Sequence, residues 1–151
     1  MNIVENQKAY LPDFIHLNEE WIAHYFTLED TDRALASGPE KTIEDGGYIF
    51  SMVSDECVLG VCALFQHGDG VFELARMAVS PLAQGNGLGR RLMQACLDKL
   101  HSIRAKRVYL VSNTCLTAAI CLYESFGFEV TFKGRDPKYV RANIVMERHF
   151  T

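Results

Sequence analysis

The stretch LARMAVSPLAQGNGLGRRL, residues 74–92, decides the fold of this chain. It begins as an apolar strand, passes through a proline turn and a glycine-rich loop, and continues as an amphipathic helix. Gly85, Gly87 and Gly89 alternate at the start of that helix, and glycine lets a backbone approach a ligand closely. A helix start also offers unpaired N–H groups and partial positive charge. The stretch therefore predicts a cradle for a pyrophosphate.

The glycine spacing limits which pyrophosphate this cradle can hold. No Lys-Ser or Lys-Thr pair follows the glycines, so the loop is not the P-loop of a nucleoside triphosphatase. The spacing G-x-G-x-G also differs from the dinucleotide fingerprint G-x-G-x-x-G, and no ribose-binding acidic residue follows the next strand. Both observations count against a nucleotide-binding domain of another fold, which stays open as an alternative.

The flanking sequence predicts a mixed sheet. The hydrophobic periods favour helices at residues 12–25, 28–37, 87–102 and 114–126. They favour strands at residues 48–53, 57–65, 71–79, 107–111, 128–132 and 143–147. The third helix is expected to bury one stripe: Leu88, Leu92, Ala95, Cys96, Leu100 and Ile103. Because an antiparallel meander is followed by a βαβ pattern, the fold class is α/β or α+β, with helices on both faces of the sheet.

Composition fits a single domain over residues 1–151. Hydrophobic residues make up 48% of the chain and charged residues 23%, which is ordinary for a globular domain with its own core. The apolar run at residues 58–65 is too short to cross a bilayer, and the first ten residues contain no hydrophobic segment. We therefore expect a cytoplasmic protein without a membrane partner.

Cysteine and histidine usage predicts neither disulfides nor a metal. The five cysteines are odd in number and form no C-x-x-C pair, and the five histidines show no ligand spacing. Such usage fits a reducing compartment.

Charge is distributed unevenly along the chain. Residues 1–47 contain ten acidic and three basic residues, a formal charge of −7. The remainder contains nine acidic and twelve basic residues, or +3, within a net charge of −4. This asymmetry suits a cationic ligand beside an anionic one, although solvated helix faces are the more common cause of such charge runs. An acidic chain of this kind is a poor candidate for nucleic-acid binding.

Three segments together resemble one family. The loop QGNGLG, residues 84–89, resembles the [QR]-x-x-G-x-[GA] signature of the GNAT superfamily of N-acetyltransferases. The strand segment MAVSP and the later CLYESFGF are similar to that superfamily at the expected separation. The resemblance covers residues 72–130 and implies a GNAT-like domain in which two central parallel strands splay apart. The pantetheine arm of acetyl-CoA would lie in that gap.

The resemblance also implies which residues bind the co-substrate. Met77, Ala78 and Val79 would pair with the pantetheine through their backbone groups. The backbone around the glycine loop would hold the pyrophosphate, at Gln84, Gly85, Asn86, Gly87, Leu88, Gly89 and Arg90. Asn113 resembles a residue that contacts the cofactor, with a polar helix cap as the alternative.

Three residues are candidates for the chemistry. The Met77 N–H would donate to the thioester carbonyl as negative charge develops there. Tyr123 would protonate the departing thiolate, with a core tyrosine as the alternative. Glu73, four residues before Met77, would accept the amine proton, with an ordered water as general base or an exposed strand-end glutamate as alternatives. Arg76 is expected on the opposite face of the strand, where it packs or pairs.

These residues predict an acetyl-CoA-dependent N-acetyltransferase acting on a primary amine. No cysteine has a histidine nearby in the sequence, so direct attack in a ternary complex is favoured over an acyl-enzyme. The alternative is a catalytically silent CoA-binding module. The acceptor, a small molecule or a peptide, is expected to be cationic and to bind between residues 18–47 and 133–141. A homodimer stays open.

Overall fold

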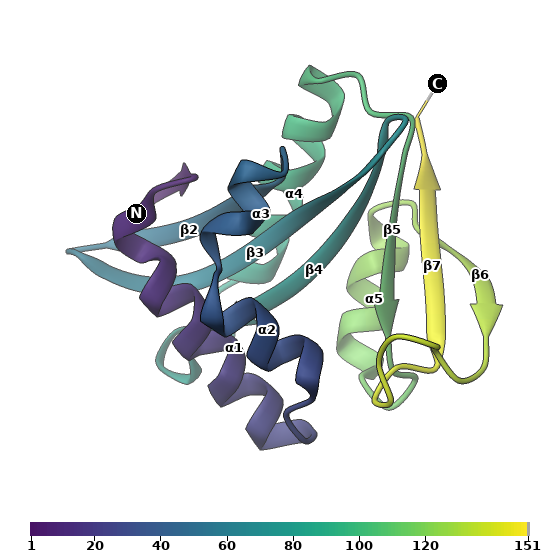
Figure 1. Ribbon diagram of the computed structural model, residues 1–151, viewed down its shortest axis with the longest axis horizontal. Helices are drawn as coiled ribbons and strands as arrows, with labels where there is room; N and C mark the ends of the chain where they lie inside the picture. The colour runs from purple at the N-terminus through teal and green to yellow at the C-terminus, as the bar shows by residue number, and fades with distance from the viewer. Residues whose placement is uncertain (151) are drawn as a thin grey trace.

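A mixed seven-stranded sheet forms the centre of the computed structural model, which describes residues 1–150. The strand order is β1-β2-β3-β4-β5-β7-β6 (Figure 1). Only β4 and β5 pair in parallel; the other neighbours are antiparallel. The strands are β1 (Asn2–Glu5), β2 (Tyr48–Ser54), β3 (Cys57–Gly68), β4 (Val71–Val79), β5 (Arg107–Ser112), β6 (Glu129–Lys133) and β7 (Ile144–His149). The predicted mixed sheet is confirmed.

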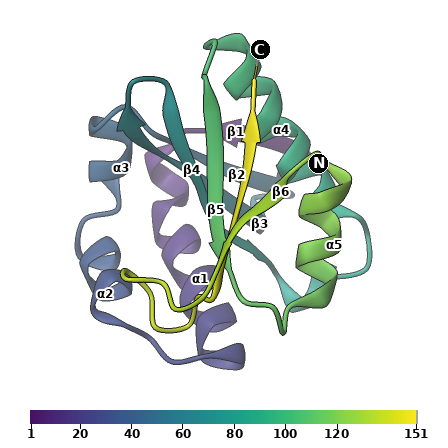
Figure 2. The same ribbon diagram turned by 90° about the vertical axis from the view of Figure 1, so that its right-hand side faces the viewer.

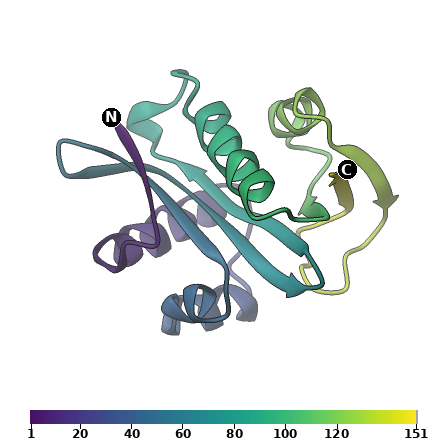
Figure 3. The ribbon, with the colours of Figure 1, turned by 90° about the horizontal axis from the view of Figure 1, so that it is seen from above.

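Helices cover both faces of the sheet, as the sequence predicts. Figure 3 shows α1, α2 and α3 on one side of the strands and α4 and α5 on the other. The helices are α1 (Leu11–Tyr25), α2 (Asp30–Ser37), α3 (Glu40–Glu44), α4 (Leu88–Ser102) and α5 (Thr117–Ser125). Short 3-10 turns precede α1 and α4, η1 (Lys8–Tyr10) and η2 (Pro81–Ala83). No helix within residues 1–150 is both long and apolar enough to cross a membrane.

Two hydrophobic cores hold β4 from opposite sides. Leu74 belongs to the core that α4 forms with the sheet, whereas Ala78 belongs to the core beneath α1. Leu92 of α4 and Phe14 of α1 are fully buried in these two cores. Burying a side chain of this size stabilises the fold by about 1.5–3 kcal/mol. The segment that carries the candidate site residues is therefore fixed between two packed layers.

A glycine ends α5 and positions the tyrosine before it. Gly127 adopts a φ of 86°, which a residue with a side chain rarely adopts. The Phe128 N–H then donates to the Tyr123 carbonyl at 3.2 Å, the bond expected of a left-handed helix end. The prediction that Gly127 terminates this helix is confirmed.

Some local predictions were wrong. The sequence did not predict β1 or α3, which have only four and five residues. The last helix begins at Thr117 rather than at 114, because Asn113 Oδ1 accepts from the Cys115 N–H and holds a turn there. Ile103, expected on the buried stripe of α4, lies beyond the end of the helix and is 36% exposed.

Candidate functional site

β4 and β5 diverge after a short paired segment. They pair from Val71 opposite Arg107 to Glu73 opposite Tyr109. Beyond this point residues 74–77 and 110–113 of the two strands line a cleft, and Figure 1 shows the strands moving apart. The free edge of β4 can accept an extended ligand as an additional strand. The predicted pair of splayed parallel strands is confirmed.

A bulge in β4 turns Arg76 towards α2. Arg76 has a φ of 60°, and the β3–β4 register changes at this point so that two residues of β4 face one of β3. The guanidinium donates to Asp32 of α2 and, at 3.1 Å, to the Tyr139 hydroxyl. Glu73 contacts Lys138, the residue next to Tyr139 in the sequence, so Glu73 and Arg76 reach the same loop. The prediction that Arg76 faces away from Glu73 was wrong, because the bulge interrupts the strand alternation. Its predicted pairing is confirmed.

The glycine loop at the start of α4 has the geometry of an anion cradle. Gly85 and Gly87 have φ values of 84° and 72°, and a Cβ on either would meet no atom within 4 Å. The first bond of the helix runs from the Arg91 N–H to the Gly87 carbonyl. Within residues 1–150, no hydrogen bond satisfies the backbone N–H groups of residues 85–90. These groups and the open space beside them fit a pyrophosphate.

Side chains around the loop fix its shape. Asn86 donates to the Ala83 carbonyl at 3.1 Å, whereas Gln84 is exposed. Arg90 lies over the Phe126 ring, 5.0 Å from its centroid, and donates to Ser125 at 3.2 Å. Leu88 is buried and anchors the first turn of α4 in the core. The ideal Cβ position of Gly89 lies 4.0 Å from Sδ of Met77, which lines the cleft.

The three β4 residues predicted to bind pantetheine lie at the diverging end of the strand. Met77 lines the cleft and packs against the α4 core, while Ala78 points to the opposite core beneath α1. Val79 pairs with Gly60 of β3 through the other edge of the strand. The backbone groups of Met77, Ala78 and Val79 that face β5 have no strand partner among the described residues 1–150, because the β4–β5 pairing ends at Glu73. A ligand can therefore bind along this edge.

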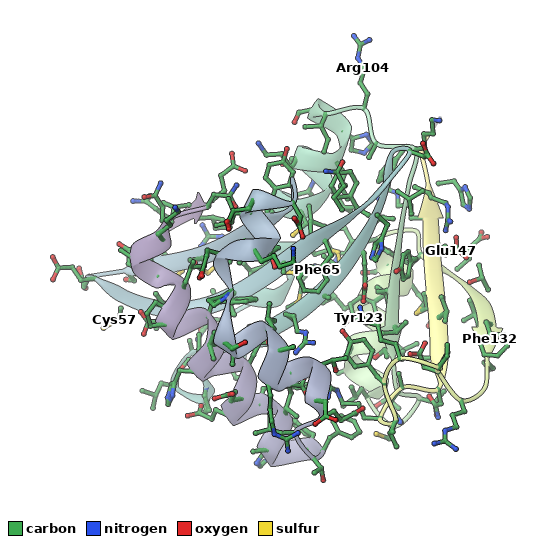
Figure 4. The ribbon with its side chains drawn as sticks, in the orientation of Figure 1. Cys57, Phe65, Arg104, Tyr123, Phe132 and Glu147 are labelled. Carbon is green, nitrogen blue, oxygen red and sulfur yellow. The ribbon has the colours of Figure 1, made fainter. Side chains whose placement is uncertain are left out.

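Tyr123 reaches the same cleft from α5. Its side chain lines the cleft together with Met77 and packs against the α4 core, and in Figure 4 it lies between α5 and the diverging strands. Burial, together with the nearby Cys62, raises the pKa of the Tyr123 phenol. The hydroxyl therefore stays protonated and keeps a proton to donate.

Glu73 is buried at the point where the strands part. It is 1% exposed, which excludes the alternative of an exposed strand-end glutamate. Its Oε1 accepts from the Tyr109 hydroxyl at 3.3 Å and lies 3.2 Å from His67 Nε2. Lys138 Nζ lies 3.5 Å from the same oxygen. The carboxylate is therefore held in place by groups from three separate segments, and it lines the cleft.

An ion-pair network joins α2 to the β6–β7 loop beside the cleft. Arg141 donates two hydrogen bonds to Asp32, at 2.7 and 2.8 Å, and one to Glu29 at 3.3 Å. Figure 2 shows the β6–β7 loop beside α2, where these contacts form. Burial alone would raise the pKa of the Asp32 carboxyl. The hydrogen bonds from Arg141 and from the Glu29 backbone, with the charges of Arg76 and Arg141, instead hold that pKa below its ordinary value.

Asn113 lies at the end of β5 and borders the cleft. Its Nδ2 donates to the Arg141 carbonyl at 2.9 Å, and its Oδ1 accepts from the Cys115 N–H. Both ends of the amide are thus bonded within the protein. The side chain joins β5 to the β6–β7 loop, and neither bond caps α5 directly.

Sequence reasoning missed several residues that surround the cleft. His67 lies six positions before Glu73, across the β3–β4 turn. Tyr109, Asp32 and Tyr139 come from distant segments, so no spacing in the sequence connects them with Glu73 or Arg76. Only the glycine-rich turn that ends β3 hinted that His67 would fold back towards Glu73. Within residues 1–150, no three His, Cys, Asp or Glu side chains gather closely enough to hold a metal ion.

Known proteins share this architecture. A solved acetyltransferase of the GNAT family from Staphylococcus aureus Mu50 superposes with a TM-score of 0.88 over 99% of both chains, at 17% identity. The yncA protein of Salmonella typhimurium, a putative acetyltransferase solved with acetyl-CoA, superposes with a TM-score of 0.77 at 23% identity over 100% of this chain and 94% of its own. At such identities the likeness concerns the fold, and it excludes a nucleotide-binding domain of another fold.

Sequence comparison supplies the family. Mycothiol acetyltransferase of Saccharopolyspora erythraea is 34% identical over 89 residues, which are 59% of this chain and 29% of that protein. The chain thus spans less than a third of that relative's length. The model of the acetyltransferase (GNAT) family matches residues 10–128, from η1 to the start of β6. The chain belongs to the acetyltransferase (GNAT) family.

Proposed function

We propose that this chain is an N-acetyltransferase that transfers the acetyl group of acetyl-CoA to a primary amine by direct attack in a ternary complex. One observation carries the proposal: Glu73, Met77 and Tyr123 line one cleft beside the free edge of β4, and Gly89 of the open loop lies next to Met77. The loop would bind the anionic pyrophosphate, and the free edge of β4 would bind the extended pantetheine arm. The three cleft residues would then surround the reacting thioester.

Backbone groups would hold the co-substrate. The N–H groups of residues 85–90 would bind the pyrophosphate, and the β5-facing edge of Met77, Ala78 and Val79 would pair with the pantetheine. The side chains of Gln84, Asn86 and Arg90 border the loop, and Asn113 supports the far wall. The Met77 N–H would polarise the thioester carbonyl, where preorganised donors lower the barrier most.

Two side chains would move protons. Glu73 would accept the proton of the attacking amine, because an alkylammonium must be deprotonated before it attacks. An ordered water relaying to Glu73 serves the same role. Tyr123 would donate its phenolic proton to the departing CoA thiolate. Its raised pKa means that the phenol carries its proton at neutral pH.

The acceptor would enter between α1, α2 and the β6–β7 loop. Asn18, Trp21 and Phe26 of the α1 region line the cleft opposite Tyr139 and Arg141. Asp32 and Glu29 are paired with arginines here, so any attraction of a cationic small molecule or peptide comes from the other acidic residues before Gly47. We also propose that residues 1–151 form one acetyltransferase domain and that the protein is cytoplasmic. The five free cysteines are in keeping with a reducing compartment.

A screen of amine acceptors tests this function. The protein is mixed with acetyl-CoA and one amine at a time, and the released CoA thiol is measured with a thiol-reactive chromophore. We expect release above the no-amine rate for at least one class among polyamines, amino acids, aminoglycosides and peptides with free N-termini. Tight acetyl-CoA binding without release for any class would instead identify a silent CoA-binding module.

A further inference from the structure

Four polar side chains meet where β4 and β5 begin to separate. His67 of β3, Tyr109 of β5 and Lys138 of the β6–β7 loop all approach one oxygen of Glu73, at 3.2, 3.3 and 3.5 Å. The Tyr109 hydroxyl also lies 3.0 Å from His67 Nε2. Glu73 lines the cleft, whereas the His67 side chain is 40% exposed. The cluster therefore connects the interior of the cleft with solvent.

Because Glu73 is buried, the proposed reaction needs a route by which a proton on Glu73 reaches solvent. Each turnover would leave a proton on a carboxyl group that is 1% exposed, and this proton must leave before the next amine can attack. We propose that His67 carries this proton from Glu73 to solvent, while Tyr109 holds the two side chains in contact. This inference rests on the proposed function and adds a positioning and relay residue to it.

The proton transfers balance without a further reagent. The amine N–H bond breaks, and the proton forms an O–H bond on Glu73, which becomes a neutral acid. The terminal torsion of a glutamate is broad and roughly twofold, so a half turn presents the proton to His67. Neutral His67, with its own proton on Nδ1, accepts it at Nε2, and the bonding pair stays on the carboxylate oxygen. The imidazolium then releases a proton to water, and proton exchange with solvent returns the ring to the tautomer with its proton on Nδ1 before the next turnover.

The neighbouring groups leave histidine as the only acceptor in this cluster. The Lys138 ammonium has donors but no lone pair. Burial, and after it the Glu73 carboxylate, raises the pKa of the Tyr109 phenol, with Tyr139 adding to the rise and Arg107 opposing it. Tyr109 therefore keeps its proton and donates a hydrogen bond to Glu73, and a neutral phenol takes up no second proton. Imidazole, by contrast, changes its charge between pH 5 and 8.

Rescue by an external buffer tests the relay. His67→Gln removes the proton carrier and keeps a polar side chain, and His149→Gln is the matched control, because His149 also lies beside a glutamate, Glu147, at 3.8 Å. We expect kcat to fall roughly ten- to a hundredfold in His67→Gln, reaching the low end of proton-transfer effects, because the lost step restores the Glu73 carboxylate after each turnover. Added imidazole at constant ionic strength should restore it progressively. The parent and His149→Gln should not respond to imidazole.

The results separate this inference from the proposed function. Full activity of His67→Gln in dilute buffer, or a loss that imidazole does not reverse, overturns the relay while the acetyltransferase function stands. If the parent releases no CoA with any amine, the function itself fails. Nitrogen NMR of the histidine rings then still tests the cluster: the His67 Nε2 signal should move on Glu73→Gln and the His149 signal should not. An unmoved His67 signal would contradict the contact between His67 Nε2 and Glu73.

Discussion

Glu73 of β4 and Tyr109 of β5 form the last residue pair before the two parallel strands separate. Their side chains are also hydrogen-bonded, from the Tyr109 hydroxyl to Glu73 Oε1 at 3.3 Å. The carboxylate is therefore tied to the paired part of the sheet, while Met77, four residues later, lines the open part. This arrangement places a candidate base at the end of the cleft and leaves the backbone beyond it free for a ligand.

The first prediction concerns ligand selectivity. CoA and acetyl-CoA should raise the melting temperature, because the unpaired N–H groups of residues 85–90 and the free edge of β4 suit a pyrophosphate with an extended arm. A ligand at one hundred times its Kd adds about 2.7 kcal/mol to the free energy of unfolding. ATP and NAD should add little in the same thermal-shift titration. Equal stabilisation by ATP would contradict the proposed co-substrate.

The second prediction tests the placement of the phosphates. Gly85→Asp should abolish acetyl-CoA binding, because the new carboxylate would occupy the open space of the cradle and repel the pyrophosphate. Gly68→Asp is a closely matched control. Gly68 has a φ of 85° against 84° for Gly85, and a Cβ at either position would meet no atom within 4 Å. Both variants should therefore lose similar stability, about 1 kcal/mol or somewhat more from the left-handed backbone.

Isothermal titration calorimetry with acetyl-CoA gives the readout for this pair. The control variant should bind within a factor of a few of the parent. Unimpaired binding by Gly85→Asp would move the phosphate site away from this loop.

The fold was predictable from the sequence where periodicity is long and uniform. Leu88, Leu92, Cys96 and Leu100 repeat at helical spacing and are all buried in α4. By contrast, β1 has four residues and pairs only with β2 at the edge of the sheet, so its sequence contains too little alternation to predict a strand. The helical stripe of α5 was identified, but the helix buries no residue completely, because that stripe faces the cleft.

The site was predictable only where it follows one continuous segment. The glycine loop and Glu73 lie within 20 residues of each other in the sequence, and the resemblance to the GNAT superfamily covers both. Arg76 shows the limit: strand alternation predicts one face, but a bulge with left-handed backbone turns the side chain to the other. Tyr109, which contacts Glu73, and both arginines that contact Asp32 come from distant segments, as in the contact of Arg141 with Asp32 across 109 positions.

The third prediction concerns acid stability. Asp32→Asn should lower the free energy of unfolding at pH 7 by about 3 kcal/mol, because Arg76 and Arg141 would lose a buried anionic partner. The folded-state pKa of Asp32 lies below its ordinary value. Its contribution is therefore complete above the unfolded value of about 3.9 and is lost as the pH falls through the folded value.

Urea unfolding of the parent and of Asp32→Asn between pH 3 and pH 7 checks this sign. The difference between the two proteins should be largest at neutral pH and should shrink below about pH 4. Asp30→Asn is the control, because Asp30 forms an exposed pair with Arg33 and such pairs contribute little. A difference that stays constant down to pH 3 would show that the Asp32 carboxylate is not the source of the stability.

The fourth prediction assigns the departing proton. Tyr123→Phe should lower kcat roughly ten- to a hundredfold, because a thiolate with a pKa near 8.5 leaves reasonably well without an acid. Acetyl-CoA affinity should change little, since only the leaving sulfur requires the hydroxyl. Tyr25→Phe, at a tyrosine that is 49% exposed, is the control. Steady-state kinetics with a responsive amine give the measurement, and unchanged turnover would make Tyr123 a core residue only.

The last prediction concerns the attack on the thioester. Glu73→Gln should depress kcat/KM for the amine and move the acidic limb of its pH profile to higher pH. Without the carboxylate, turnover depends on amine that is already deprotonated in solution, and an alkylammonium such as that of lysine has a pKa near 10.4. Glutamine keeps the volume and can still accept a hydrogen bond from Tyr109, so far-UV circular dichroism should match the parent. Glu56→Gln, in the exposed β2–β3 turn, controls for the loss of one charge. An unshifted acidic limb in Glu73→Gln would exclude Glu73 as the base and would leave that role to water.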